Sequence, residues 1–555
     1  MNAIARDPPQ GAGEGNVAAQ ARLVAALCRL LDEGTGVRVL ETHISFVILT
    51  GRYAYKIKKA VNLGFLDFRA LSSRSFYCGE ELRLNRRTAP GIYLGVVAIT
   101  GSVDAPTLGG RGPAIEYALK MREFRQDALA IHALPRGELS ASCIDALAVQ
   151  IAGLHGTARA AAPAGPHGDP EVILRFALDN FERMRPGGAD PEDDRRADRL
   201  RAWTQAEHSA IAAIMRARQS RARVRECHGD LHLGNIAAID GKPVIFDCLE
   251  FSEDLRWTDV MSDVAFLVMD LRRHGRRDLA HRLLSAYLEI TGDYDGLRVL
   301  RFYLVYRAMV RAMVARERAR QLGPGSSRDS AVADFRGYLG VARDFAQERC
   351  PAIVITHGFS GCGKTTHSQS LVGAIAGVRI RTDVERKRMH GLRPTDRHRD
   401  GLDATLYSGG VTRWVYRRVL ALTEASASAG FPTIVDGAFL WHWQREMFRD
   451  LARKLRIPFL IVTFDADEAT LRARVALRMQ RATDASDADL AVLERQIRSH
   501  DPLDPAEAAE SVAIDAEALP PSALEGRNWD VVCERLQRAA RGVTPPQPAS
   551  ATSTA

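Results

Sequence analysis

The sequence predicts two domains of different class: an α+β domain, followed by an α/β domain with three layers, α/β/α, around a parallel sheet. Three observations support this prediction. The segment 356–366, THGFSGCGKTT, lies between an apolar run and a helical pattern. A polar motif at 227–236, CHGDLHLGNI, lies upstream among long helical patterns and short strands. After residue 351, apolar strands and helical segments alternate, which is typical of parallel sheets with right-handed crossovers.

The composition is that of a globular protein, with 46% hydrophobic and 26% charged residues among 555. The net charge of +8 suits anionic partners, but the arginines are interleaved with Asp and Glu, so nucleic-acid binding is possible without being favoured. The eight cysteines include no CxxC pair, which argues against a zinc site or a disulfide scaffold. Because no apolar leader or run of about 18 apolar residues is present, we expect a cytoplasmic protein without a membrane span.

The first domain is expected at 17–345, after a Gly- and Pro-rich stretch at 1–16 that predicts disorder. Val17–Leu31 has the apolar spacing of an amphipathic helix. Short runs between turn residues predict strands at 37–42, 44–50, 53–59, 92–99 and 114–121, with one helix that ends at 85. Helical patterns follow, interrupted by a hairpin around Asp240-Gly241, at 142–154, 170–184, 194–218, 259–273, 276–291 and 297–322.

The second domain is expected at 351–542. Its strands are predicted at 353–356, 379–382, 433–435 and 459–464, with a weaker one at 511–514. The tail at 543–555 contains Pro, Ser and Thr and predicts disorder.

The segment 356–366 has the complete Walker A spacing, Gly-x4-Gly-Lys-Thr. Its glycines allow successive backbone N–H groups to surround an anion, and the following helix points its positive end at the same place. Lys364 is expected to reach the β- and γ-phosphates, and Thr365 to offer its hydroxyl to Mg²⁺. We therefore predict that the chain binds ATP through Gly358, Phe359, Ser360, Gly361, Cys362, Gly363, Lys364, Thr365 and Thr366.

The motif at 228–235, HGDLHLGN, has the H-x-D-x4-N form of a kinase catalytic loop. Asp230 can accept the proton of a substrate hydroxyl, and Asn235 can ligate Mg²⁺. Asp247 follows an apolar run and can hold the metal that bridges the phosphates. The alternative is a polar turn with incidental His and Asp, which the downstream carboxylate and an upstream lysine strand disfavour.

A lysine that neutralises the phosphates is expected from the strand 53–59, YAYKIKK. Lys56 is the first candidate, but Lys56 and Lys58 share one face of a strand, so the choice between them is open. Glu81 on the following helix is the expected ion-pair partner, with Glu80 as the alternative.

CHGDLHLGNI followed by VIFDCLEF resembles the aminoglycoside-phosphotransferase-like kinases, a branch of the protein-kinase-like fold. Four further stretches resemble the N-terminal half of bacterial two-domain proteins described as bifunctional aminoglycoside phosphotransferase/ATP-binding proteins: ETHISFVIL, YAYKIKKAVNLGFLDF, LNRRTAPGIYL and YALKMREF. The resemblance covers about 20–540. It does not establish an antibiotic substrate.

The resemblance implies a catalytic base, two metal ligands, a phosphate lysine and an adenine-side hinge, which would be Asp230, Asn235 with Asp247, Lys56, and residues 116–120. One departure is that no glycine-rich GxGxxG loop precedes Lys56. Another turn must then cover the β-phosphate, and Ser45 and Thr50-Gly51 are the candidates.

In the second domain, Asp383 follows the second predicted strand, where small-molecule and polynucleotide kinases place the carboxylate that takes the acceptor's proton. Arg386, one helical turn later, can hold the acceptor or a phosphate. The pair resembles the Asp-x-x-Arg of phage-type polynucleotide kinases and similar elements of gluconate-kinase-like and zeta-toxin-like proteins. The alternative for Asp383 is an N-cap on a charged helix.

Asp436 ends the third strand and is expected to reach Mg²⁺ directly or through water, with a simple turn Asp as the alternative. Arg474, Arg478 and Arg481 share a helical face and resemble the lid arginines of nucleoside-monophosphate-kinase-like folds. They would neutralise the transferring phosphoryl group, although a solvated arginine face has the same pattern. The stretch 483–489 then predicts a mobile lid turn.

Together these features predict an ATP- and Mg²⁺-dependent kinase with two nucleotide sites that acts on a hydroxyl of a small molecule. The second hypothesis is a polynucleotide or nucleotide kinase that uses the C-terminal site alone. The third is an ATP-binding regulatory protein without transfer. His155, in AGLHGTA, is expected to be a packed helix histidine rather than a catalytic one.

Overall fold

The computed structural model describes residues 16–542, apart from 33, 35, 65, 164, 186–189, 394, 395, 397–408, 482–487 and 516–528. The two stretches predicted to be disordered lie outside the described residues, except for Asn16. The chain forms two compact units, the first from 1–179 and 208–270 and the second from 180–207 and 271–555. These units interleave along the chain, whereas the domains expected from the sequence follow one another, and that sequential division stays a prediction.

The first unit begins with an antiparallel sheet whose described strands have the order β1-β2-β3-β6-β4-β5. Asn16 caps the N-terminus of the first helix, and its side chain accepts the N–H of Ala18. Its apolar face packs on the sheet, with Leu27 in one cluster with Ile48 and Ile57. The elements are α1 (Val17–Leu31), β1 (Arg38–Glu41), β2 (Ser45–Leu49), β3 (Tyr53–Lys58), α2 (Leu71–Asn85), β4 (Tyr93–Gly101), β5 (Pro106–Leu108) and β6 (Glu116–Arg122).

The rest of the first unit is mainly helical, with two small antiparallel sheets. The predicted hairpin is confirmed, because β8 and β9 pair around Asp240 and Gly241, which both have positive φ. The elements are η1 (Gln126–Ala128), α3 (Ala130–Ala133), α4 (Ala141–Thr157), β7 (Val224–Glu226), η2 (Leu233–Asn235), β8 (Ile236–Ile239), β9 (Lys242–Ile245), α7 (Glu253–Arg256) and β10 (Trp257–Asp259). Three helices have residues in both units: α5 (Pro170–Met184), α6 (Pro191–Ser220) and α8 (Val260–Arg273).

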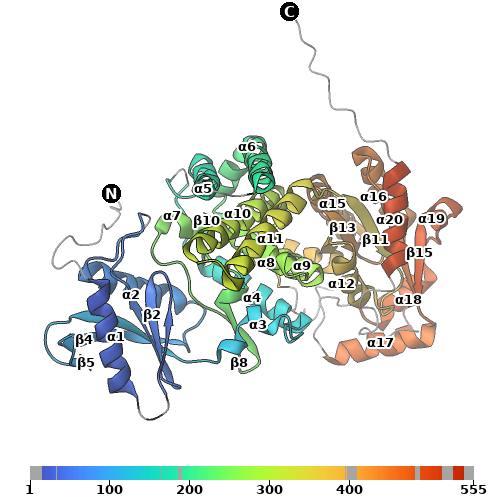
Figure 1. The fold of residues 1–555 in the computed structure, drawn as a ribbon. Helices are drawn as coiled ribbons and strands as arrows, with labels where there is room; N and C mark the ends of the chain where they lie inside the picture. Colours follow the sequence, from blue (N-terminus) through green and yellow to red (C-terminus); the bar gives the residue numbers. More distant parts are fainter. Residues whose placement is uncertain are drawn as a thin grey trace, which may run out of the picture. The chain divides into compact units, whose positions relative to one another are not determined.

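The second unit contains four further helical elements before its sheet: α9 (Arg277–Thr291), η3 (Tyr294–Gly296), α10 (Leu297–Gln321) and α11 (Ser326–Gln347). Its described sheet has five parallel strands in the order β12-β13-β11-β14-β15, of which β13, β11 and β15 are labelled in Figure 1. The strands are β11 (Ala352–His357), β12 (Val378–Arg381), β13 (Pro432–Asp436), β14 (Phe459–Asp465) and β15 (Ser511–Asp515). The parallel sheet predicted from the alternating pattern is therefore confirmed.

Helices cover both faces of this sheet. On one face, Val354 of β11 packs in a cluster with Leu371 of α12 and Val532 of α20. On the other side, the rings of Tyr416 in α15 and Phe448 in α16 both contact Phe439. Strands buried on both faces explain the continuous apolar runs in the sequence. The helices are α12 (Lys364–Ala374), α13 (Thr382–Met389), α15 (Gly409–Ser428), α16 (His442–Leu455), α17 (Glu468–Arg481), α18 (Leu490–Arg498), α19 (Pro505–Ala509) and α20 (Asp530–Gly542).

The strand order places a crevice at the phosphate loop. The chain leaves β11 towards β12 on one side, while β14 lies on the other side of β11. Ligands of open α/β sheets bind at such switch points, outside the carboxyl ends of the strands. Within the described ranges, no helix combines the length and the apolar character that a membrane crossing requires.

Candidate functional site

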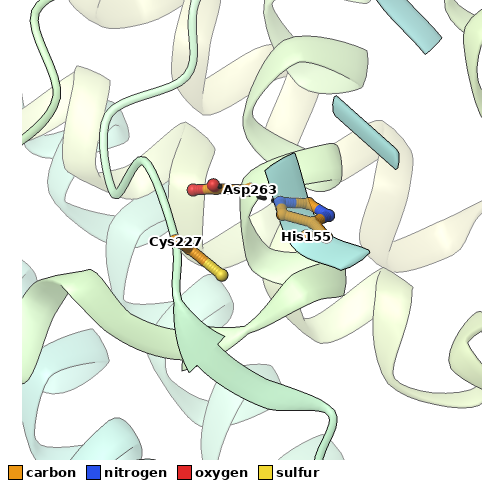
Figure 2. Close-up of side chains that lie close together, drawn as sticks. All are labelled: His155, Cys227 and Asp263. Atoms are coloured by element: carbon orange, nitrogen blue, oxygen red, sulfur yellow. Dashed lines mark hydrogen bonds and ion pairs between the residues drawn. The ribbon is translucent and has the colours of Figure 1, made fainter. Parts of the chain in front are cut away.

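Asp263 on α8 lies close to His155 and Cys227 (Figure 2) and accepts hydrogen bonds from the backbone of the catalytic-loop motif of the first unit. The Asp263 carboxylate accepts the backbone N–H of His228 at 2.7 Å and that of Gly229 at 2.9 Å. It also lies 3.3 Å from Nε2 of His155 on α4. His155, Cys227 and Asp263 could in principle hold a metal, but the carboxylate is already used by these donors. The cluster supports the loop, and His155 is packed as predicted.

Asp230 and Asn235 lie together across the motif. Asn235 Nδ2 donates to the carbonyl oxygen of Asp230 at 2.9 Å and to its carboxylate Oδ2 at 3.0 Å. His232 Nε2 lies 3.4 Å from the same carboxylate oxygen. Because the Asp230 side chain is 38% exposed, a hydroxyl group of a substrate can reach it.

Lys56 on β3 links α2 to Asp247, which follows β9. Its Nζ donates to Glu81 Oε1 at 2.8 Å and to Asp247 Oδ1 at 2.7 Å. Burial alone would lower the pKa of Lys56, but the carboxylates of Asp247 and Glu81 raise that pKa well above its usual value. Lys56 is therefore a fixed cation beside a carboxylate that was predicted to bind metal.

Lys58 also pairs with Glu81, so the two lysines are not exclusive alternatives. Its Nζ donates to Glu81 Oε2 at 2.6 Å and to Glu250. Burial acts to raise the pKa of Glu81, but the Lys56 and Lys58 ammonium groups lower that pKa to about 2. The Lys58 side chain is only 1% exposed, which disfavours its contact with a nucleotide, and the assignment of Lys56 as the phosphate lysine stays a prediction. Glu80 pairs with an arginine on its own helix instead.

Asp247 has a left-handed backbone, with φ at 61°, which is uncommon outside Gly, Asn and Asp. Its N–H donates to the Tyr93 hydroxyl at 3.1 Å. Neither Tyr93 nor Glu250 nor Asp263 was predicted as a site residue. Each contacts a residue that is distant in the sequence, so no local pattern in the sequence signals the contact.

Two expected nucleotide contacts need correction. Residues 116–120 lie inside β6, which pairs with β3 on one side and β4 on the other, so they are part of the sheet and not a hinge. Ser45 lies opposite Lys58 at one end of β2, and Thr50-Gly51 form the turn at the other end. The Ser45 side chain is fully buried, so its hydroxyl cannot cover a phosphate.

In the second unit, the phosphate loop joins β11 to α12. Gly358 has φ at 142°, and a Cβ there would lie 2.5 Å from the Phe464 carbonyl oxygen, so the loop requires glycine. Lys364 begins α12, and its Nζ donates to the carbonyl oxygens of Gly358 at 2.8 Å and Phe359 at 2.6 Å. The Cys362 side chain lies in the hydrophobic core, and Phe359 packs at its margin. We therefore expect only backbone contacts with ATP from these two residues.

A cavity of about 520 Å³ opens over this loop. Among the predicted residues, its walls include Ser360, Gly361, Gly363, Lys364, Thr365, Thr366, Asp383, Arg386, Asp436, Arg474 and Arg478. Asp383 lies in the first turn of α13, and Arg386 follows one turn later. The phosphate loop and the candidate acceptor residues therefore share one cavity.

Asp436 ends β13 beside two arginines of β12 that were not predicted. The Asp436 carboxylate accepts the hydroxyl of Ser368 at 3.3 Å. Arg379 and Arg381 place guanidinium nitrogens 3.8 and 3.7 Å from Asp436 Oδ2. The Arg-Ile-Arg pattern of a strand, which puts both arginines on one face, was the signal available in the sequence.

The predicted lid arginines are described only in part. Arg474 and Arg478 on α17 line the cavity, and Arg478 donates to the carbonyl oxygen of Ala488 at 2.6 Å. The side chain of Arg481 and residues 482–487, with most of the predicted lid turn, lie outside the described residues. The lid function of this region stays a prediction.

Comparison with known families gives two separate matches along the sequence. Residues 121–303 match the model of the phosphotransferase enzyme family, and residues 353–503 match the model of an AAA domain. The first match contains the catalytic-loop motif and the second contains the phosphate loop.

Among curated proteins, an uncharacterized protein of Mycobacterium tuberculosis is 29% identical over 417 residues. The match covers 75% of this chain and 80% of that protein. An uncharacterized protein of Mycobacterium bovis matches with the same identity and coverage.

Several solved structures are similar in part. A Plasmodium vivax ethanolamine kinase has 8% identity and a TM-score of 0.36, covering 56% of this chain and 84% of that one. A choline/ethanolamine kinase family protein from Mesorhizobium loti has 13% identity and a TM-score of 0.34, covering 59% and 99%. A gluconokinase from Sinorhizobium meliloti 1021 has 21% identity and a TM-score of 0.23, covering 35% and 95%. The family matches therefore give the chain a phosphotransferase-type segment at 121–303 followed by an AAA-type segment at 353–503, and the predicted fold class is confirmed.

Proposed function

We propose that this protein is an ATP-dependent kinase with two nucleotide sites, each of which transfers the γ-phosphoryl group to a hydroxyl of a small molecule. The observation that carries the proposal is the cavity in which the phosphate loop, Asp383 and Asp436 come together. The contacts of Lys56 with Glu81 and Asp247 support a second site in the first unit.

Both sites offer the oxygen donors that Mg²⁺ prefers. In the first unit these are the Asn235 amide and the Asp247 carboxylate, and in the second the Thr365 hydroxyl and the Asp436 carboxylate. Mg²⁺ held by these residues would supply positive charge that balances the charge developing on the phosphates during transfer.

The side chains of the first unit have separate tasks. Asp230 takes the proton of the acceptor hydroxyl as the new O–P bond forms, while the bond between the γ-phosphorus and the β–γ bridging oxygen breaks and ADP leaves. Asn235 keeps the Asp230 carboxylate in place through its Nδ2 donation at 3.0 Å. Lys56 holds the phosphates, and Glu81 keeps the Lys56 ammonium charged and oriented.

In the second unit, the backbone of the phosphate loop and Lys364 bind the phosphates. To do so, the Lys364 ammonium exchanges its present contacts with two loop carbonyls for phosphate oxygens. Asp383 takes the acceptor's proton, and Arg386, Arg474 and Arg478 balance the charge of the phosphoryl group in the same cavity.

A nucleotide or polynucleotide acceptor at the C-terminal site is the second candidate. The walls of the cavity include Arg381, Arg386 and Arg495, which suit an acceptor that already carries a phosphate group. This candidate predicts that a 5′-hydroxyl oligonucleotide is a better acceptor than an uncharged sugar.

The test is transfer of label from γ-labelled ATP to a panel of metabolites and 5′-hydroxyl oligonucleotides. Lys56→Ala should remove the ATP binding and transfer of the site in the first unit, and Lys364→Ala should remove those of the site in the second unit. Lys454→Ala, an exposed lysine paired with Glu424, is the matched control and should change neither. Full transfer by both Asp230→Asn and Asp383→Asn would refute the catalytic assignments. ATP binding without transfer to any acceptor would favour a regulatory protein.

A further inference from the structure

The outer edge of β12 is covered by side chains of α9 and η3. β12 is the first strand in the sheet order, so one of its edges has no neighbouring strand among the described residues. The N–H of Arg379 donates to the Ser285 hydroxyl at 3.0 Å, and the Tyr294 hydroxyl donates to the carbonyl oxygen of Arg379 at 3.0 Å. Nδ1 of His281 lies 3.3 Å from the carbonyl oxygen of Gly377. These are the backbone groups that another strand would use.

The approach of α9 to the P-loop domain is close along its whole length. At one end, a Cβ on Gly373 of α12 would lie 3.1 Å from Cα of Asp278. At the other end, Arg388 of α13 donates to the carbonyl oxygens of Glu289 and Ile290, in the last turn of α9. Both ends and the middle of α9 are therefore fixed against this domain.

Glu289, in the last turn of α9, binds two arginines. Arg379 donates to Glu289 Oε2 at 3.2 Å, and Arg381 donates to Glu289 Oε1 at 3.1 Å. Burial acts to raise the pKa of Glu289, but the two guanidinium groups lower it, so the carboxylate is charged. The three side chains form a buried, charged fork between α9 and β12.

The same two arginines contact the predicted Mg²⁺ ligands. Arg379 donates to the carbonyl oxygen of Thr365 at 2.8 Å, and both arginines lie within 3.8 Å of the Asp436 carboxylate. The two carboxylates, of Glu289 and Asp436, balance the two guanidinium groups, so the net charge of these four groups is zero. If Glu289 lost its charge, both guanidinium groups would turn to Asp436, and the resulting net positive charge would oppose the binding of Mg²⁺.

We propose that Glu289 is a positioning residue of the P-loop site: it accepts hydrogen bonds from Arg379 and Arg381, keeps their nitrogens 3.8 and 3.7 Å from Asp436 Oδ2 rather than at hydrogen-bonding distance, and so leaves this carboxylate available to Mg²⁺. The inference rests on the proposed function of the site. It also means that α9, which lies in the segment matched by the phosphotransferase family, completes a site in the segment matched by the AAA domain.

The test uses the full chain with Lys56→Ala, so that only the P-loop site binds ATP. The measurement is the Mg²⁺ concentration that gives half-maximal binding of a fluorescent ATP analogue. Glu289→Gln should raise this concentration about 10- to 100-fold, as for other residues that orient metal ligands, and excess Mg²⁺ should restore binding. Adding Arg381→Gln to Glu289→Gln restores neutrality and should recover most of the loss. Glu317→Gln, which removes a partly exposed carboxylate paired with Arg183, is the matched control.

Three outcomes decide between the explanations. An unchanged Mg²⁺ requirement in Glu289→Gln would overturn the inference. So would a loss that neither excess Mg²⁺ nor Arg381→Gln recovers, together with a lower melting temperature, because that result indicates a purely structural residue. If Lys364→Ala binds the analogue as well as the parent protein does, the proposed function of the site fails instead.

Discussion

Replacing Glu81 by Gln tests the buried charge network of the first unit. Glu81 is fully buried and accepts hydrogen bonds from Lys56 at 2.8 Å and Lys58 at 2.6 Å. Gln has nearly the same shape but no charge, so the variant leaves two lysines with one carboxylate fewer. The neighbouring Glu80, which is partly exposed and pairs with Arg83, provides a matched control.

The loss in the free energy of unfolding that we expect for Glu81→Gln follows from the pKa of Glu81. The two lysines lower it from 4.5 to about 2, and one pH unit corresponds to about 1.4 kcal/mol, so the charged form contributes about 3 kcal/mol at pH 7. Breaking a buried ion pair costs about 3–5 kcal/mol, which agrees. Glu80→Gln removes a surface pair and should cost less than about 1 kcal/mol.

Urea unfolding of the full chain measures the effect, with hydrogen exchange of the β3 and α2 amides to assign it to the first unit. At a slope of about 3 kcal/mol per molar, Glu81→Gln should lower the midpoint by about 1 M. Because the folded pKa is depressed, the difference from the wild type should be complete above pH 4.5 and shrink as the pH falls towards 2. Equal midpoints for Glu81→Gln and the wild type, or equal losses for both glutamates, would refute the reasoning.

Three further outcomes are expected. Burial, then Arg272 and Arg277, lower the pKa of His281 from 6.5 to about 3, so the imidazole is neutral in the folded protein. The free energy of unfolding of the second unit should therefore fall by about 2 kcal/mol between pH 7.5 and pH 5, and it should fall less in His281→Asn, as measured by unfolding at both pH values. Asp263→Asn should displace the catalytic loop and reduce Lys56-dependent transfer about 100-fold at unchanged ATP binding, which single-turnover kinetics will show. Leu371→Ala, at a fully buried position, should cost about 2–5 kcal/mol in the unfolding of the second unit, and a smaller loss would mean that the core closes around the cavity.

Local patterns in the sequence predict most of the elements. The helix expected at Val17–Leu31 is α1 with the same bounds, because its apolar period lies within one helix and can be read from the local sequence. The strands expected at 353–356 and 459–464 lie within β11 and β14. Buried parallel strands leave apolar runs that can be read without knowing their neighbours.

Only those residues of the candidate site that belong to a recognisable sequence motif could be predicted. Lys364 and Asp230 occur in short motifs whose spacing follows from their chemistry. Glu289 and Arg379 are 90 residues apart, and nothing in either segment indicates that they pair. The hinge expected at 116–120 was wrong for the same reason, since only the pairing of β6 with two neighbours shows that it is an inner strand.

The covered edge of β12 has a consequence for work with fragments. A fragment that begins near residue 351 keeps every strand of the parallel sheet but loses Ser285 and Tyr294, which satisfy the backbone of Arg379. Its exposed strand would then be free to pair with the same strand of another molecule. We expect such a fragment to associate and to lack the P-loop activity of the full chain, whereas a fragment that begins before α9 should stay monomeric by size-exclusion chromatography.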